Sequence, residues 1–308
     1  RIKNRRGNRK QIGDLIKSLC QNREYSLVFI SMKSRDTTGI VAEVSKFVCV
    51  HEGNVRKGGQ NVYEKMGMFF KRTSWQLDSC VWEKEKIAAR FELEVGECVQ
   101  MDFNLHFNFP KPRMAIFVSK LSHCLFDILG RHYAGQLEVD IPLVVSNHPN
   151  LSKVVEAFGI PFHHIPINSE TKAAAEANQL ELMKANQIDF VVLGRYMQIL
   201  SAEFIQHFPN RIINIHHSFL PAFVGAKPYH AAYERGVKII GATAHYVTEE
   251  LDAGPIIEQE VARVRHHNTV PELVQIGQDV EKVVLSKAIK YHIDRKVMSI
   301  NNKTVIFY

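Results

Sequence analysis

The sequence predicts a two-domain α/β protein, in which a small ferredoxin-like βαββαβ domain precedes a Rossmann-like, mostly parallel doubly wound sheet. The chain has 308 residues, which is more than one typical hydrophobic core requires. Pro110 and Pro112 interrupt regular structure between two blocks of strands and helices. The apolar runs after these prolines are continuous, as in strands buried on both faces of a parallel sheet. We therefore expect a tail over residues 1–24, a first domain over 25–109 and a second over 112–308.

The first domain follows the order strand, helix, strand, strand, helix, strand. Its first helix is predicted from an apolar stripe that includes Ile40, Val44 and Phe47, and Gly53 marks the end of that helix. The six expected elements cover, in chain order, residues 27–32, 39–51, 61–64, 68–77, 83–95 and 99–107. This order is the split βαβ, or ferredoxin-like, pattern.

A polar turn joins the first strand of this domain to its first helix. It reads Asp36-Thr37-Thr38-Gly39-Ile40-Val41, and Asp or Thr can cap a helix that begins there. With its flanking strand and helix and the following Asn54-Val55, the turn resembles an ACT domain, a small regulatory module that often binds amino acids between subunits. The resemblance implies a regulatory site at Asp36, Gly39 and Ile40, an effector such as methionine or glycine, and a homo-oligomer formed through this domain. Arg35 departs from the pattern, because ACT domains often have proline there.

The second domain alternates strands with helices, as expected for a parallel sheet covered on both faces. Its strands are predicted at residues 113–119, 140–146, 162–167, 189–193, 211–215 and 237–247. Its helices are predicted at residues 123–133, 151–158, 171–186 and 270–293, where helix-forming residues or apolar stripes occur.

The composition is that of an ordinary soluble globular protein, with 45% hydrophobic and 23% charged residues. No apolar run approaches the length of a membrane span, and nothing resembles a signal peptide. Most of the net charge of +7 comes from six basic residues at positions 1–10, so we expect a flexible tail and neither a nucleic-acid nor a membrane partner. An Arg-rich, acid-free start is also typical of the remnant of an organelle transit peptide, and this alternative stays open.

Cysteine and histidine usage argues against disulfide and metal sites. The five cysteines are odd in number and form no Cys-x-x-Cys pair, which indicates reduced thiols and a cytoplasmic location. The pairs His163-His164 and His266-His267 have no carboxylate or cysteine partner at ligand spacing, so we expect no metal. Cys124, near a predicted helix start, is expected to be a buried core thiol.

Polar side chains stand where two apolar strands of the second domain end. Asn214 and His216 alternate with Ile215 and therefore point to the same face of their strand. Asp252 lies in the loop after the next strand, before a Gly254-Pro255 turn, and a parallel neighbouring strand would bring that loop to the same rim. An amide, an imidazole and a carboxylate together can stabilise an oxyanion and move a proton, which indicates chemistry at a carbonyl carbon.

The residues around this trio are similar to a known family. Asn214-x-His216 followed by Ser218-Phe219-Leu220-Pro221, and the later Leu251-Asp252-x-Gly254-Pro255, resemble the folate-dependent formyltransferase fold family. The run Gly225-Ala226-Lys227-Pro228-Tyr229-His230 and the run from Ala232 to Val247 resemble, within that family, the formyltetrahydrofolate deformylases. An ACT-like block before a formyltransferase-like block is also their domain order, so the resemblance covers nearly the whole chain after the tail.

The resemblance implies that the protein hydrolyses 10-formyltetrahydrofolate to formate and tetrahydrofolate, which supplies formate for purine biosynthesis and balances one-carbon folate pools. Asn214 and His216 would donate hydrogen bonds to the formyl oxygen, and Asp252 would orient His216 or the water and accept a proton. No cofactor is implied, because reduced folate is the substrate. The folate would be bound by residues that follow two strands at the same rim: Leu193, Tyr196, Met197, Ile199, Leu200, Val247, Thr248, Glu249 and Leu251.

Two other functions remain open at this point. A formyltransferase to an amine acceptor would share the catalytic trio, but the turn at residues 120–124 has no glycine with which to approach a phosphate closely, and this favours water as the acceptor. A catalytically inactive amino-acid sensor would not need Asn214, His216 and Asp252. His217 is expected to be a wall residue, and Ser218 lacks the Gly-x-Ser-x-Gly surroundings of a nucleophile.

Overall fold

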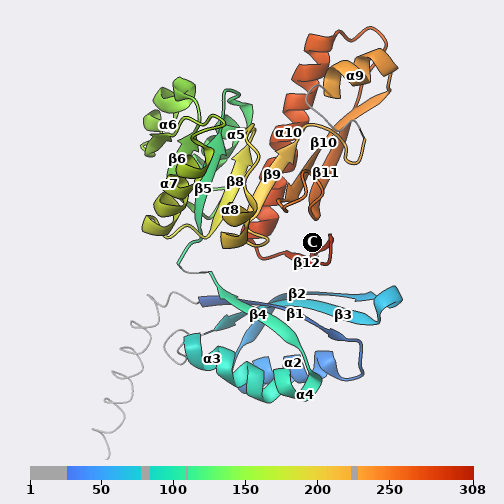
Figure 1. Cartoon of the computed structure of the whole chain (residues 1–308). Coiled ribbons are helices and arrows are strands. Elements are labelled where there is room, and N and C mark those ends of the chain that lie inside the picture. Colours follow the sequence, from blue (N-terminus) through green and yellow to red (C-terminus); the bar gives the residue numbers. More distant parts are fainter. Residues whose placement is uncertain (1–25, 78–83, 109, 223–227) are drawn as a thin grey trace, which may run out of the picture. The chain divides into compact units, whose positions relative to one another are not determined.

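The computed structural model describes residues 26–77, 84–108, 110–222 and 228–308 (Figure 1). They belong to two compact units, Arg1–Pro110 with Phe307–Tyr308 and Lys111–Ile306. The tail expected over residues 1–24 lies outside the described residues. Among the described helices, none combines the length and the apolar character needed to cross a membrane.

The first unit has the predicted ferredoxin-like order and a four-stranded antiparallel sheet, β2-β3-β1-β4. Its elements are β1 (Ser26–Arg35), α2 (Ile40–Val50), β2 (Asn54–Tyr63), β3 (Met68–Leu77), α3 (Lys84–Phe91) and β4 (Asp102–Phe107), with short helical turns at Glu64–Met66, Glu92–Gly96 and Glu97–Val99. Strand β2 begins seven residues before the expected start at residue 61, because nearly all of its side chains are exposed and show no apolar alternation.

Helix α2 and the sheet form the core of the first unit. Ile40, Val44, Phe47 and Val48 are the buried face of α2, as the apolar stripe predicts. They belong to one cluster with side chains of β1 and β3, including Trp75.

The second unit contains a seven-stranded sheet in the order β11-β10-β9-β8-β5-β6-β7. Its strands are β5 (Arg113–Val118), β6 (Asp140–Ser146), β7 (Phe162–His164), β8 (Phe190–Gly194), β9 (Ile212–His216), β10 (Ile239–Tyr246) and β11 (Ile256–Arg263). The first five of these run parallel, whereas β10 is antiparallel to both β9 and β11. The predicted mostly parallel sheet is confirmed.

Helices cover both faces of this sheet, so the doubly wound prediction is also confirmed (Figure 1). The helices are α5 (His123–Tyr133), α6 (Ser152–Ala157, after a short turn at Pro149–Leu151), α7 (Lys172–Ala185), α8 (Ala202–His207), α9 (Pro228–Arg235) and α10 (Val270–Ile293). One core cluster joins α5 and α10 to the sheet, and a second joins α7 and α8 to its other face. A two-stranded hairpin, β12 (Val297–Ile300) and β13 (Lys303–Ile306), follows α10 and is not predicted by the sequence.

Candidate active site

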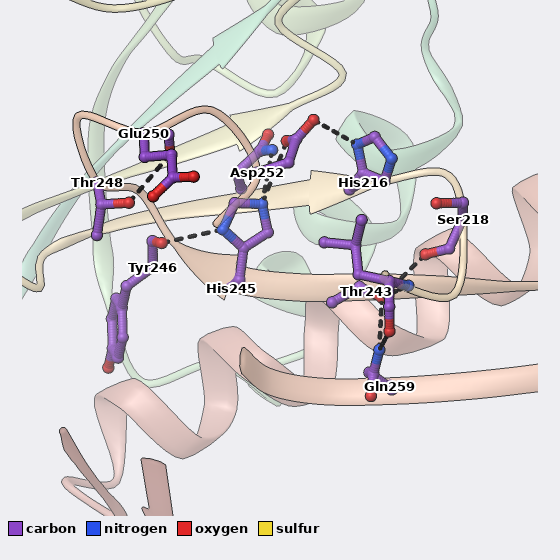
Figure 2. Close-up of polar contacts among 11 residues, drawn as sticks. His216, Ser218, Thr243, His245, Tyr246, Thr248, Glu250, Asp252 and Gln259 are labelled. Atoms are coloured by element: carbon purple, nitrogen blue, oxygen red, sulfur yellow. Dashed lines mark hydrogen bonds and ion pairs between the residues drawn. The ribbon is translucent and has the colours of Figure 1, made fainter. Parts of the chain in front are cut away.

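The centre of the site is a hydrogen-bonded group at the junction of β9 and β10 (Figure 2). His216 Nδ1 lies 3.1 Å from Asp252 Oδ2, and His245 Nε2 lies 3.5 Å from the other carboxylate oxygen, Oδ1. Asn214 Nδ2 lies 3.2 Å from His245 Nε2, because the antiparallel register places these two residues opposite each other. The structure therefore brings the predicted trio of Asn214, His216 and Asp252 together.

The path of the Asp252 loop differs from the prediction. Strand β10 is antiparallel to β9, so its end at Tyr246 lies beside the beginning of β9, not beside His216. The loop must therefore fold back, and it rejoins β10 where Tyr246 N–H donates to the Pro255 carbonyl. Asp252 adopts a left-handed conformation with φ of 55° within this loop. The expectation of a parallel neighbour was wrong, although the loop still delivers the carboxylate.

Gly254 is required by this folded-back path. A Cβ atom at position 254 would overlap the backbone oxygen of Tyr246. Only glycine permits such a close approach of two backbone segments. Gly254 thus allows the loop that carries Asp252 to pack against the backbone of Tyr246.

We expect Gly254→Ala to lower kcat by roughly 10²-fold, because a displacement of about 1 Å at a reacting group can cost that much. The substitution forces the loop away from Tyr246. Gly130→Ala is the matched control, since Gly130 lies in α5 with open space around it. Steady-state kinetics, with circular dichroism to monitor folding, would measure both variants. An unchanged kcat in Gly254→Ala would contradict this account of the loop.

The imidazoles fix the charge state of the centre. The hydrogen bond from His216, followed by that from His245, holds the pKa of Asp252 well below its usual range, so the carboxyl is ionised at neutral pH. His216 donates to Asp252 through Nδ1–H, and its buried Nε2 has no hydrogen-bond partner among the described residues. An unpartnered buried nitrogen beside a cavity is a candidate for proton transfer.

His245 is a functional residue to which the sequence analysis assigned no role. Its Nδ1–H donates to the Tyr246 carbonyl at 2.9 Å, and its Nε2 lies 3.5 Å from Asp252 Oδ1 and 3.2 Å from Asn214 Nδ2. The ring thereby orients the Asn214 amide. The sequence signal that could have indicated this role is a histidine within a largely apolar strand. A buried polar side chain in a core strand needs a specific hydrogen-bond partner.

The trio opens into a cavity of about 360 Å³ that is lined largely by apolar side chains. All nine residues predicted to bind folate lie in its wall: Leu193, Tyr196, Met197, Ile199, Leu200, Val247, Thr248, Glu249 and Leu251. The wall also contains Arg195 and Gln198 from the same segment, Ile205, which was not predicted, and His217 as the expected wall residue. A mostly apolar pocket with a few convergent polar groups suits a flat heteroaromatic ligand.

The segment after β8 is held in place by hydrogen bonds from the interior. Met197 N–H donates to the Ser119 hydroxyl at 3.1 Å, and Gln179 donates to the Tyr196 hydroxyl at the same distance. Ser201 N–H donates to the Glu176 carboxylate at 3.1 Å. The cavity wall is therefore preformed on this side.

The turn before α5 is tied to α10 through the side chain of His123. His123 Nε2 lies 2.8 Å from Glu281 Oε2, and Tyr229 donates its hydroxyl to Glu281 Oε1 at 2.6 Å. His123, Cys124 and Glu281 are the group of described residues whose ligand atoms lie close enough together to suit a metal ion. Both carboxylate oxygens of Glu281 are already engaged, and burial raises the pKa of the Cys124 thiol well above its ordinary value. The expectation that the protein binds no metal stays a prediction.

The residues of the ACT-like turn belong to the first unit. Asp36 is exposed, and its N–H donates to the Gly67 carbonyl at 2.9 Å. Gly39 has a φ of 96° immediately before α2, a conformation that favours glycine. Ile40 is buried in the core, so its side chain packs in the domain. A regulatory role for the three residues stays a prediction.

Comparison with known proteins places this fold and site in the formyltransferase class. Residues 112–289 match the family described as Formyl transferase, which accounts for more than half of the chain. The structure of glycinamide ribonucleotide transformylase 1 from Symbiobacterium toebii aligns with a TM-score of 0.62 and 28% identity, over 67% of this chain and 98% of that one.

Relatives that match more of the chain narrow this class. The formyltetrahydrofolate deformylase of Synechocystis sp. is 47% identical over 272 residues, which cover 88% of this chain and 95% of the relative. The crystal structure of a formyltetrahydrofolate deformylase from Pseudomonas syringae pv. tomato aligns with a TM-score of 0.89 and 40% identity, over 96% of this chain and 99% of that one. The chain belongs to the formyltetrahydrofolate deformylase family. Residues 225–227 of its motif lie outside the described residues.

Proposed function

We propose that this protein hydrolyses 10-formyltetrahydrofolate to formate and tetrahydrofolate. The observation that carries the proposal is the convergence of Asn214, His216 and Asp252 on a cavity lined by the residues predicted to bind folate. Similarity to proteins named formyltetrahydrofolate deformylase supports the same reaction. The reduced folate is the substrate, and the proposed chemistry requires no cofactor.

The proposed mechanism begins with the attack of water on the formyl carbon. The Nε2 of His216 accepts the proton from this water, while ionised Asp252 stabilises the imidazolium that forms. Negative charge grows on the formyl oxygen and is stabilised by the Asn214 N–H that does not face His245. His216 then returns the proton to the folate nitrogen as the C–N bond breaks. Because Asp252 has a depressed pKa, we assign proton transfer to His216 rather than to the carboxylate.

Water is the acceptor that the turn at residues 120–124 favours. A phosphorylated amine needs open backbone N–H groups close to its phosphate. In this chain the turn has no glycine, and its His123 is bound to the buried carboxylate of Glu281. This arrangement supports hydrolysis over formyl transfer.

The test is to incubate the protein with 10-formyltetrahydrofolate in the absence of any amine. We expect formate and tetrahydrofolate to appear in equal amounts, with a rate that added amines leave unchanged. A parallel reaction with glycinamide ribonucleotide would serve as the comparison. Formate release that fails without an amine, or a formylated amine as the product, would favour the transferase instead.

We also propose that the first unit makes the protein a homo-oligomer and binds an amino-acid effector, methionine or glycine, at the Asp36 turn. The hydrogen bond from Asp36 N–H to Gly67 and the left-handed Gly39 give this turn a defined shape. We expect the deformylation rate to change at least twofold with millimolar effector, and Asp36→Ala to reduce that response. A flat rate with both amino acids would refute the effector, and a monomer in sedimentation experiments would refute the oligomer.

A cytoplasmic location is likewise proposed. Cys49, Cys98 and Cys124 carry free thiols in the part of the chain that the structure describes. Reduced thiols are the rule in the cytoplasm. Fractionation of the native host cells would test this placement.

A further inference from the structure

A second, smaller cavity adjoins the folate cavity of the second unit. Its volume is about 160 Å³, and it is lined by the turn before α5, the start of α9 and one side of α10. Arg195 and His217 line both cavities. The ring of His217 lies 5.1 Å from that of His216, centroid to centroid. The wall between the two cavities thus consists in part of one imidazole next to the catalytic one.

Arg195 brings a positive charge with an unused donor to this wall. Its side chain is only 10% exposed, and the residue follows β8 with a left-handed φ of 62°. Nε lies 3.5 Å from Glu281 Oε2 and has no hydrogen-bond partner among the described residues. A buried donor on a charged group is costly to leave unsatisfied. The terminal N–H groups of the guanidinium remain as donors for an acceptor in the cavity that Arg195 lines.

Glu281 is the ion-pair partner of Arg195, at 3.5 Å from Nε, and its carboxylate also accepts other hydrogen bonds. Tyr229 donates to Oε1 and His123 lies against Oε2, in a site where Glu281 is 1% exposed. Gly277 permits this arrangement, since a Cβ at that position would overlap the ring of Tyr229. Glu281 therefore positions Arg195 electrostatically and leaves guanidinium N–H groups for a second acceptor.

We propose that the smaller cavity binds formate, the carboxylate product, through Arg195; this inference rests on the proposed deformylation. A guanidinium matches the two oxygens of a carboxylate in one plane. The cavity has room for a few molecules of water size, which each occupy about 30 Å³ in the liquid. A pteridine-sized ligand needs roughly 300 Å³ or more, so the larger cavity suits the folate and the smaller one its one-carbon fragment.

The chemistry explains why formate would move there. The water oxygen bonds to the formyl carbon, the C–N bond breaks, and the folate nitrogen gains a proton. The formic acid then loses its own proton to solvent water, so that an anion is left beside ionised Asp252. Repulsion from Asp252 and attraction to Arg195 both favour passage past His217 into the smaller cavity. Glu281 also lines that cavity, but its charge is engaged by hydrogen bonds with His123 and Tyr229. The folate cavity is thereby cleared for release of tetrahydrofolate.

Direct binding of [¹³C]formate to the folate-free protein tests the inference without turnover. We expect broadening of the formate resonance by the wild-type protein, and a dissociation constant raised at least tenfold in Arg195→Met. Val274→Phe, which fills the smaller cavity from α10, should also abolish binding. Arg131→Met is the matched control, because this cation on α5 pairs with Asp127 and lies outside both cavities. Circular dichroism would verify that each variant folds.

Formate binding that is equal in wild-type protein and Arg195→Met, or that survives Val274→Phe, would overturn the inference. Inhibition of turnover by added formate is expected to weaken in Val274→Phe in the same proportion as binding. Hydrolysis of the formyl folate without any binding of formate would contradict the proposed formate site but not the proposed reaction. A protein that binds formate through Arg195 but releases none from the folate would leave this site standing and contradict the proposed reaction.

Discussion

Asp252→Asn is expected to lower kcat by about 10³- to 10⁴-fold, while the dissociation constant for tetrahydrofolate changes by less than about threefold. The substitution keeps the shape of the side chain but removes the charge that stabilises the His216 imidazolium. The ionised state of Asp252, held by its two histidine partners, is the reason for this large effect. Steady-state kinetics and equilibrium binding of the folate would separate the two quantities.

Glu250→Gln is the matched control for this variant. Glu250 lies in the same loop, is exposed and does not line the cavity. Loss of its charge should leave kcat within about twofold of wild type, as is common for exposed charges. A comparable loss of kcat in both variants would show that activity depends on the total charge of the loop and not on Asp252 itself. An undiminished kcat in Asp252→Asn would remove this carboxylate from the mechanism.

Asn214→Ala should lower kcat by about 10²- to 10³-fold with little change in KM, because the amide N–H is used mainly in the transition state. His245→Gln provides a graded comparison: it disturbs the partner that orients Asn214 but keeps the donor itself. Its loss of kcat should therefore be smaller. If Asn214→Ala raises KM and leaves kcat unchanged, Asn214 binds the substrate and does not stabilise the oxyanion.

The order of strands and helices could be predicted because core strands and helices have clear apolar periods. Strand β2 began earlier than expected, since its exposed side chains show no such period. Strand β11, at the sheet edge, shows no regular alternation of polar and apolar residues, and the strands of the β12–β13 hairpin are too short to give a signal. These elements depend on neighbours that are distant in sequence.

In the candidate site, too, the features that depend on local sequence could be predicted, and those that depend on distant segments could not. Asn214 and His216 could be placed on one face because the alternation of a strand is local. The position of Asp252 depends on the direction of β10 and on the close approach of Gly254 to Tyr246, neither of which the local pattern specifies. The role of His245 appears only when its register opposite Asn214 is known.

Hydrolysis by water attack at the formyl carbon is the central claim, and oxygen labelling tests it directly. The reaction is run with 10-formyltetrahydrofolate in H₂¹⁸O without an amine, and the formate is analysed by mass spectrometry at early times. The mechanism predicts one ¹⁸O atom in each formate molecule and unlabelled tetrahydrofolate. Formate without ¹⁸O, or no formate until an amine is supplied, would contradict it.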